Sequence, residues 1–128
     1  MKKILIVDDE NSLRTLVSAT LEGGRCKILQ AKNGREAVDI ALKEKPNLII
    51  LDLMMPVMTG LEALEVIRKT EGISDTPVVV LSAKGHLKDR EKALKSGATT
   101  YLTKPFSPLD LLKVVEEILD GVKKQVRS

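Results

Sequence analysis

The 128-residue chain has almost no aromatic side chains: Trp is absent, and Tyr101 and Phe106 are its one Tyr and its one Phe. A nucleic-acid surface built on base stacking needs several exposed rings, so the sequence excludes this class of site. Cys26 is the single cysteine, which excludes an intrachain disulfide and argues against a structural zinc site made of thiolates. The core must therefore be almost entirely aliphatic.

Long apolar runs and a strong charge of one sign are also missing. The chain carries 21 Lys and Arg against 18 Asp and Glu, a net charge of +3 spread along the sequence, which is weak support for nucleic-acid binding. The apolar residues 4–7 meet Asp8-Asp9-Glu10 too soon for a signal peptide, and no stretch approaches the length of a membrane span. We therefore expect a cytoplasmic protein with no membrane partner and no direct nucleic-acid binding.

A short aliphatic run, followed by a turn signal and an amphipathic segment, occurs five times. The runs cover residues 4–7, 26–30, 48–51, 78–81 and 99–103. Several are apolar at every position, which is typical of parallel strands covered on both faces, and the β-branched Val78-Val79-Val80 favours strand over helix. The pattern predicts an α/β fold with three layers, in which helices cover both faces of an open five-stranded parallel sheet.

Several intervening segments carry signals for helix boundaries. Asn33 and Thr59 each stand three residues before a glutamate, as in a capping box, and Ser107 precedes a proline and an early acid. The last segment has one apolar stripe at helical spacing: Leu112, Val115, Ile118, Leu119 and Val122. We expect one domain over residues 1–121, with residues 122–128 as a polar tail or the start of a linker.

Polar side chains gather at the carboxyl ends of four of the aliphatic runs. Asp8 and Asp9 follow the first run, Asp52 the third, Ser82 the fourth and Lys104 the fifth. In an open parallel sheet, ligands bind at this edge, where the strand order reverses. Each residue alone has an ordinary explanation, as an acid at a helix start or a turn, a strand-end hydroxyl or a solvated lysine. Chance rarely places all of them at successive strand ends.

Three carboxylates at one edge would repel each other, by roughly 4 kcal/mol for each pair about 4 Å apart at an effective dielectric constant of about 20. Lys104 alone cannot balance three negative charges, so we expect a divalent cation. Oxygen ligands with no His or Cys nearby favour Mg²⁺ over Zn²⁺. A few carboxylates are also the usual way to hold Mg²⁺ where a phosphate joins the metal.

These residues resemble the receiver domain of response regulators in two-component signalling. The resemblance extends from Lys3 to about Gly121 and rests on an ordered set of motifs: Ile6-Val7-Asp8-Asp9-Glu10, Leu51-Asp52-Leu53-Met54-Met55-Pro56 with Gly60, Leu81-Ser82-Ala83, and Lys104-Pro105-Phe106. It implies the flavodoxin-like strand order 2-1-3-4-5, as in a chemotaxis regulator. It also implies a cis peptide bond at Lys104-Pro105.

The resemblance implies a role for each residue at the sheet edge. Asp52 is the phosphoacceptor, which attacks a phosphohistidine of a sensor histidine kinase or of a histidine phosphotransfer protein. Lys104 and Ser82 contact oxygens of the phosphoryl group. The Mg²⁺ ion, for which Mn²⁺ can substitute, has these ligands: Asp8, Asp9, Asp52 and the main-chain carbonyl of Met54. Such a chain is not an enzyme beyond catalysing its own phosphorylation and dephosphorylation.

The resemblance also implies a switch and two protein-binding surfaces. Ser82 and Tyr101 form the switch, which alters the face made by the fourth helix, the fifth strand and the fifth helix for a downstream protein target. Leu16, Ala19 and Thr20 lie beside the apolar stripe of the first helix and dock the kinase, or else they only widen the core face. The protein is then a monomer or a phosphorylation-dependent dimer.

Two other functions on the same fold stay open. A flavin- or nucleotide-binding module would carry a phosphate loop rich in glycine or hydroxyl groups after the first strand, where this chain has Asp8-Asp9-Glu10. A metal-dependent phosphohydrolase would turn over an external substrate and usually place a second acid beside the nucleophile. The sequence is compatible both with a stand-alone regulator and with the receiver part of a longer protein.

Overall fold

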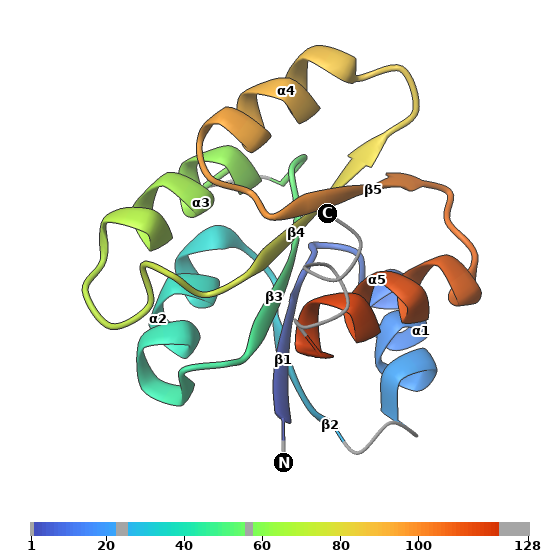
Figure 1. Cartoon of the computed structure of the whole chain (residues 1–128), viewed down its shortest axis with the longest axis horizontal. Coiled ribbons are helices and arrows are strands. Elements are labelled where there is room, and N and C mark those ends of the chain that lie inside the picture. The colour runs from blue at the N-terminus through green and yellow to red at the C-terminus, as the bar shows by residue number, and fades with distance from the viewer. Residues whose placement is uncertain (1, 23–25, 56–57, 121–128) are drawn as a thin grey trace.

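The computed structural model describes residues 2–22, 26–55 and 58–120, in which strands and helices alternate (Figure 1). The strands are β1 (Lys2–Val7), β2 (Cys26–Ala31), β3 (Leu48–Asp52), β4 (Val78–Ala83) and β5 (Thr100–Lys104). The helices are α1 (Asn11–Glu22), α2 (Gly34–Glu44), α3 (Gly60–Lys69), α4 (Leu87–Lys95) and α5 (Pro108–Asp120). Each strand predicted from the sequence is confirmed, with ends that differ by at most two residues.

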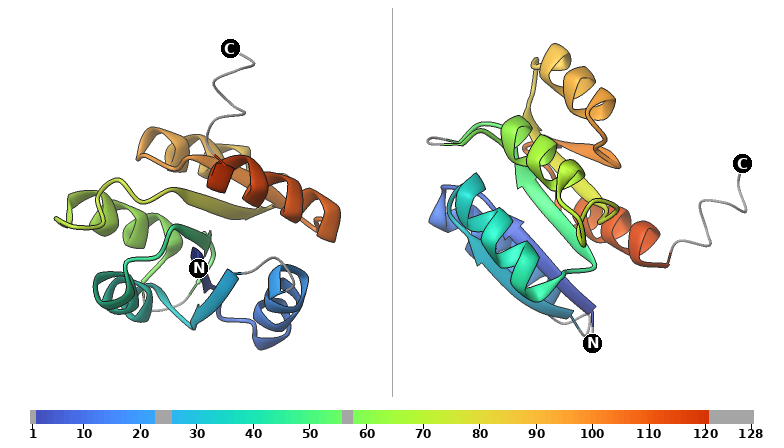
Figure 2. Two further views of the ribbon diagram at one scale, coloured as in Figure 1. Left: turned by 60° about the horizontal axis from the view of Figure 1, so that its bottom comes forward. Right: turned by 90° about the vertical axis from the view of Figure 1, so that its left-hand side faces the viewer.

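The five strands form one parallel sheet in the order β2-β1-β3-β4-β5, which confirms the predicted flavodoxin-like fold. The order reverses between β1 and β3, because the chain first builds outward to β2 and then returns to the other side of β1. Helices α1 and α5 cover one face of the sheet, and α2, α3 and α4 cover the other (Figure 2).

Two aliphatic clusters, one on each face of the sheet, form the core. Leu5 and Val7 of β1 pack toward α2 and α3, whereas Ile4 and Ile6 pack toward α1 and α5, because successive side chains of a strand point to opposite faces. All four side chains are fully buried. Coverage of both faces explains why the central strands are apolar at every position.

Local hydrogen bonds fix where the helices begin. Thr59 and Glu62 form the predicted capping box at the start of α3. At α2, Asn33 Oδ1 accepts from the main-chain N–H of Glu36, but the Glu36 carboxylate accepts from the main-chain N–H of Lys32. In a complete capping box the Glu36 carboxylate would accept from the main-chain N–H of Asn33. The predicted capping box of α2 is therefore wrong in this bond, because Glu36 reaches one residue farther back along the chain, to Lys32.

The predicted buried stripe of α5 is right only in part. Val115 is buried, but Leu112 is only half-buried. The most buried described side chain of α5 is Leu111, which the stripe omits. Leu111 lies four residues before Val115, one turn away on the same face of the helix.

Some predictions concern the ends of the chain. The described residues end before three of these predictions: the domain boundary at residue 121, Val122 in the apolar stripe, and the tail at residues 122–128. Within residues 2–22, 26–55 and 58–120, no helix is both long enough and apolar enough to cross a membrane.

Candidate functional site

Three carboxylates meet at the carboxyl edge of the sheet. Asp8 follows β1 and Asp52 ends β3, and their exposed fractions are 0% and 3%, while Asp9 is exposed. One carboxylate oxygen from each residue lies within 4.8 Å of the other two. The register of the sheet pairs Val7 with Leu51, so the next residues along the two parallel strands, Asp8 and Asp52, are neighbours. The fold thus brings together the acids that the sequence placed at strand ends.

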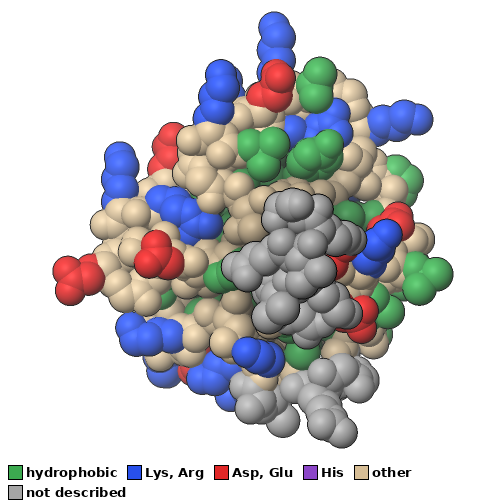
Figure 3. Space-filling model, viewed as in Figure 1, with side chains coloured by type: hydrophobic (Ala, Val, Ile, Leu, Met, Phe, Trp, Pro, Cys, Tyr) green, Lys and Arg blue, Asp and Glu red, His purple; other side chains and the backbone are tan. Residues whose placement is uncertain are grey.

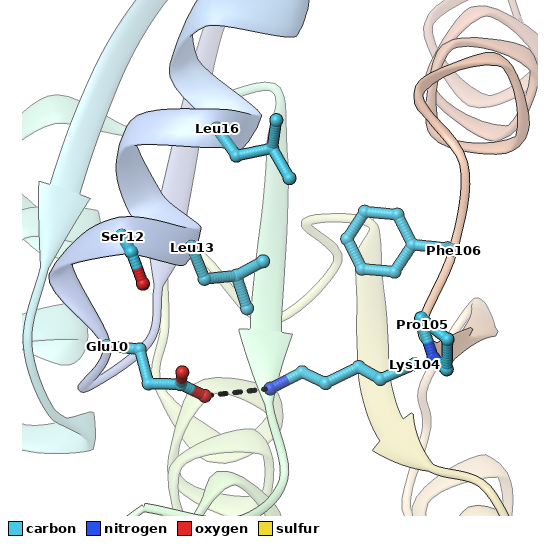
Figure 4. Close-up of a pocket in the computed structure, with 7 residues that line it drawn as sticks. All are labelled: Glu10, Ser12, Leu13, Leu16, Lys104, Pro105 and Phe106. Atoms are coloured by element: carbon cyan, nitrogen blue, oxygen red, sulfur yellow. Dashed lines mark ion pairs between the residues drawn. The ribbon is translucent and has the colours of Figure 1, made fainter.

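Lys104, the last residue of β5, extends toward these acids. Its Nζ lies 3.3 Å from Asp52 Oδ2, 3.3 Å from Asp8 Oδ2 and 3.9 Å from Glu10 Oε1, and Figure 4 shows the contact with Glu10. The sequence did not suggest Glu10 as a partner of Lys104. The Lys104-Pro105 peptide bond is cis, as the resemblance implied. With three carboxylates around it, the ammonium group of Lys104 faces more negative charge than it can balance.

Burial and the neighbouring charges together shift the pKa of Asp52 and the pKa of Lys104. Burial raises the pKa of Asp52 to about 6, and Asp8 adds to the rise, while the N–H of Met54 and the ammonium of Lys104 oppose it. Burial also works to lower the pKa of Lys104, but Asp52 and Asp8 outweigh it and hold that pKa above its ordinary value. Ionised Asp52 is therefore costly at neutral pH unless another cation joins the site.

Ser82 lies in β4, between the strands that carry Asp52 and Lys104. The residue is buried, and its Oγ forms no hydrogen bond within the described part of the chain. The register of β4 and β5 pairs Ser82 with Thr103, the residue before Lys104. Because a buried hydroxyl without a partner is unfavourable, the position of Ser82 Oγ is suited to bond an atom of a ligand.

The segment between β3 and α3 is held close to Asp52. Asp52 Oδ1 accepts a hydrogen bond of 3.1 Å from the main-chain N–H of Met54, whose side chain is exposed. Leu53 O accepts from the N–H of Gly60 at 3.1 Å. Met54, whose carbonyl the resemblance assigns to the metal, thus adjoins the site through its main chain.

Two arginines beside the site were missed by the sequence analysis. Arg14 of α1 is 7% exposed, and its Nη1 donates to the main-chain oxygen of Asp8. Arg90 of α4 donates from Nη1 to Thr103 Oγ1 at 3.0 Å, and its guanidinium carbon lies 5.0 Å from the centroid of the Tyr101 ring. The sequence does contain a signal that Arg14 is buried: it precedes the buried Val17 by three residues, so the two residues share one face of the helix.

The residues assigned to kinase docking lie on the outer side of α1. Leu16 is 48% exposed and Ala19 is exposed, while Thr20 is half-buried and donates from Oγ1 to the main-chain oxygen of Leu16 at 2.8 Å. Leu16 and Ala19 therefore do not widen the core face, which is made by residues such as Val17 and Leu21.

A pocket of about 440 Å³ lies beside the site, between α1 and the segment after β5. Phe106 faces Leu13 and Leu16 across it, and Lys104 lies at one end (Figure 4). Phe106 and Leu13 also pack against the core cluster under α1 and α5. An apolar surface is thus continuous with the charged edge of the sheet.

Comparisons with known proteins agree with this geometry. The family model for the response regulator receiver domain matches residues 4–116. The probable transcriptional regulator ycf27 of Porphyridium aerugineum is 38% identical over 123 residues, which are 96% of this chain and 50% of that protein. The phosphate regulon transcriptional regulatory protein PhoB of Pseudomonas aeruginosa is 37% identical over 92% of this chain and 52% of that protein. The chain spans about half the length of the curated relatives it matches.

Among solved structures, the chemotaxis protein CheY4 of Vibrio cholerae superposes with a TM-score of 0.86 and 37% sequence identity. The match covers 92% of this chain and 98% of that one. The similarity therefore includes both the sequence and the complete fold of that protein.

Proposed function

The chain belongs to the response regulator receiver domain family, whose members are signalling domains rather than classical enzymes, and we propose on this basis that Asp52 is its phosphoacceptor. The donor is a phosphohistidine of a sensor histidine kinase or of a histidine phosphotransfer protein. One observation carries the proposal: Asp52 is buried at the sheet edge, paired with Lys104 and clustered with Asp8 and Asp9.

The transfer exchanges one bond to phosphorus for another. A carboxylate oxygen of Asp52 attacks the phosphorus, the new P–O bond forms as the P–N bond of phosphohistidine breaks, and an acyl phosphate remains on Asp52. Because the transition state of phosphoryl transfer is loose, the protein mainly positions groups and offsets charge. Lys104 pairs with a phosphoryl oxygen, and the Ser82 hydroxyl donates to another, which provides the partner that Ser82 Oγ lacks among the described residues.

The site also fits a divalent cation. The side chains clustered there that could bind a metal are all carboxylates, and one oxygen from each lies within 4.8 Å of the others. Such a set of oxygen ligands is suited to Mg²⁺ rather than Zn²⁺. We propose that Asp8, Asp9, Asp52 and the main-chain carbonyl of Met54 hold Mg²⁺, with Mn²⁺ as a substitute. When bound, the ion supplies positive charge that offsets the charge of the phosphoryl oxygens.

Phosphorylation then alters the face formed by α4, β5 and α5. An acyl phosphate on Asp52 adds negative charge and acceptor oxygens beside Ser82 and Lys104. Arg90 contacts Tyr101 and Thr103, so α4 is already joined to the strand that ends at Lys104. Ser82 and Tyr101 act as the switch, and the altered face binds a downstream protein.

The composition of this face suits a protein target. Leu87, Leu94 and Tyr101 are exposed there, and Figure 3 shows hydrophobic side chains among Lys and Arg side chains over α4. We propose that the receiver domain, over residues 1–121, acts in the cytoplasm without direct nucleic-acid or membrane binding. It does so as a monomer or as a phosphorylation-dependent dimer.

The kinase docks on the outer side of α1, at Leu16, Ala19 and Thr20. Exposed Leu16 lines the pocket that ends at Lys104, so a partner helix seated there brings its phosphohistidine to the charged edge. Family membership favours this function over a flavin- or nucleotide-binding module and over a metal-dependent phosphohydrolase on the same fold.

Labelling with a radioactive small acyl phosphate and Mg²⁺ tests the phosphoacceptor. The wild type is expected to become labelled, and hydroxylamine, which cleaves acyl phosphates, is expected to remove the label. Asp52→Asn should not be labelled, whereas the control Asp39→Asn, at an exposed position of α2, should be labelled normally. A label that persists in Asp52→Asn would rule out the assignment.

A further inference from the structure

Arg14 is a buried charged residue that the proposed chemistry does not use. Within the described ranges, the buried polar or charged residues are Asp8, Arg14, Asp52 and Ser82, and all except Arg14 belong to the site. Burial of a guanidinium is unfavourable unless its N–H groups are bonded. The arrangement of those bonds therefore indicates what Arg14 does.

The guanidinium joins three segments around the end of β1. Nη1 donates to the main-chain oxygen of Asp8, Nη2 donates to Asn11 Oδ1 at 3.0 Å, and Nε donates to Gln30 Oε1 at 3.1 Å. Asp8 follows β1, Asn11 begins α1 and Gln30 lies in β2. Arg14 thus bridges both ends of the short loop that carries Asp9.

Arg14 also completes the hydrogen bonds of the Asp8 main chain. The Asp8 N–H donates to Ala31 O at 3.2 Å, which holds the peptide unit before Asp8. The bond from Arg14 to Asp8 O holds the peptide unit that links Asp8 to Asp9. Because this second unit ends at the Cα of Asp9, its orientation is one of the factors that set where the exposed Asp9 carboxylate points.

The contact is directional rather than charge-neutralising. In the described part of the chain, Arg14 forms no ion pair, and it bonds the main-chain oxygen of Asp8 instead of the carboxylate. Lys104 is the cation that pairs with Asp8 and Asp52. The two basic residues therefore have separate roles at one edge of the sheet.

We propose that Arg14 is a positioning residue, which fixes the peptide unit between Asp8 and Asp9 and thereby sets the metal affinity of the carboxylate cluster. The inference rests on the proposed function, because it takes Asp8, Asp9 and Asp52 to be the metal ligands. Residues that orient metal ligands without touching the metal typically account for about 10–100-fold in metal affinity.

Titration with Mn²⁺, followed by the electron paramagnetic resonance signal of free Mn²⁺, measures this affinity directly. Arg14→Met is expected to raise the Kd for Mn²⁺ by about tenfold or more. Arg14→Lys keeps the charge but loses the planar fork, so its Kd is expected to lie between those of the wild type and Arg14→Met.

Arg68→Met is the matched control. Arg68 is a half-buried arginine near the end of α3, and its guanidinium also donates to main-chain oxygens: those of Ser74, Thr76 and Gly97. Its loss is expected to lower the melting temperature without changing the Kd for Mn²⁺. The pair of variants separates a general loss of packing from a specific loss of metal-site geometry.

Asp9→Asn distinguishes failure of this inference from failure of the proposed function. If Asp9→Asn leaves the Kd unchanged, the cluster is not the metal site, and the proposed metal ligands and the role of Arg14 both fall, while labelling of Asp52 remains the separate test of the phosphoacceptor. If Asp9→Asn weakens binding but Arg14→Met stays within about twofold of the wild type, well below the usual 10–100-fold effect, only the role of Arg14 is overturned.

Gln30→Ala covers the case in which Arg14→Met does not fold. Gln30 is exposed on β2 and accepts from Arg14 Nε, so its removal releases one arm of the guanidinium without opening the core. An increase of about threefold or more in the Kd supports the inference, given that weakened ligand orientation lowers metal affinity. An unchanged Kd contradicts it.

Discussion

A Cβ atom on Gly60 would lie 2.1 Å from the main-chain oxygen of Asp52 and 2.5 Å from the Cα of Leu53. These distances are far shorter than a non-bonded contact allows. Gly60 begins α3, so the first turn of this helix rests directly on the end of β3. Close approach of two backbones is one of the situations that require glycine. The position of Asp52 thus depends on a contact that a side chain at Gly60 would prevent.

Gly60→Ala is expected to lower the free energy of unfolding by about 1–3 kcal/mol, the usual cost of forcing extra volume into a packed site. Because the clash falls on the main chain of Asp52, labelling by a small acyl phosphate should also slow. Chemical denaturation and the rate of labelling measure the two effects.

Gly85→Ala is the control for Gly60→Ala. A Cβ there meets no atom within 4 Å, but Gly85 has φ +90°, so the substitution costs only backbone conformational energy of about 1–2 kcal/mol. Its labelling rate should stay near that of the wild type. A Gly60→Ala variant with unchanged stability and labelling would mean that α3 moves away from β3 at no cost.

The buried charge of Asp52 gives a pH dependence of stability. Its pKa is about 6 in the folded protein against the ordinary value of 3.8, so the folded state holds the proton more tightly than the unfolded state. The contribution of protonated Asp52 to the free energy of unfolding is therefore fully present below its pKa in the unfolded state. It is lost as the pH rises through its pKa in the folded state. The difference between the two values corresponds to roughly 3 kcal/mol.

Asp52→Asn should therefore be more stable than the wild type at pH 7, by about 1–3 kcal/mol in the absence of metal. Near pH 4, close to the ordinary pKa of 3.8, the two proteins should become nearly equal. Urea denaturation with a chelator present measures the difference, and Asp39→Asn serves as the control. If Asp52→Asn is instead the less stable protein at pH 7, the ion pair with Lys104 outweighs the cost of burial.

The sequence was enough to predict the fold and the clustering of Asp8 and Asp52 at the carboxyl edge of the sheet. Neighbouring parallel strands bring their carboxyl ends to one edge, so once residues 4–7 and 48–51 are recognised as strands, Asp8 and Asp52 must lie close together. The continuous apolar runs identify these strands because both faces of the sheet are covered. The same topology brings Lys104, at the end of β5, to this edge of the sheet, but its contacts with Asp8 and Asp52 depend on how far its long side chain reaches.

Other features depend on how each helix is rotated and on where long side chains reach. The α5 stripe missed Leu111 because several adjoining faces of that helix are apolar. The Glu36 carboxylate bonds Lys32 rather than closing its capping box, a choice made by side-chain conformation. Helical spacing places Arg14 on the same face as Val17, but the contact of its guanidinium with the main chain of Asp8 is visible only in the packed structure.

Leu16→Asp tests the docking surface on α1. Leu16 is exposed, so the fold should be retained, with a change in the free energy of unfolding within about 0.5 kcal/mol. Phosphotransfer from the kinase should fall because a charge enters the apolar pocket, while labelling by a small acyl phosphate should continue. Leu42→Asp, at a similarly exposed position of α2, is the control. Equal loss of phosphotransfer in both variants would contradict docking at Leu16.

Tyr101 provides an optical probe of the proposed switch. It is the one tyrosine of a chain without Trp, so tyrosine fluorescence comes from this ring alone. Tyr101 is 39% exposed, and the Arg90 guanidinium carbon lies 5.0 Å from its ring centroid. Inward movement of the ring would change both its contact with water and its contact with Arg90, and either change alters the fluorescence intensity.

Addition of a small acyl phosphate and Mg²⁺ should therefore change the fluorescence of the wild type, and the change should be absent in Asp52→Asn. Ser82→Ala, which lacks the hydroxyl beside the phosphoryl group, should become labelled but show a smaller change. Arg90→Ala should shift the fluorescence before phosphorylation, because the cation over the ring is gone, and should still respond afterwards. If the wild type becomes labelled while its fluorescence stays constant, Tyr101 does not sense Asp52, and α4 and β5 must receive the signal through another contact, such as that between Arg90 and Thr103.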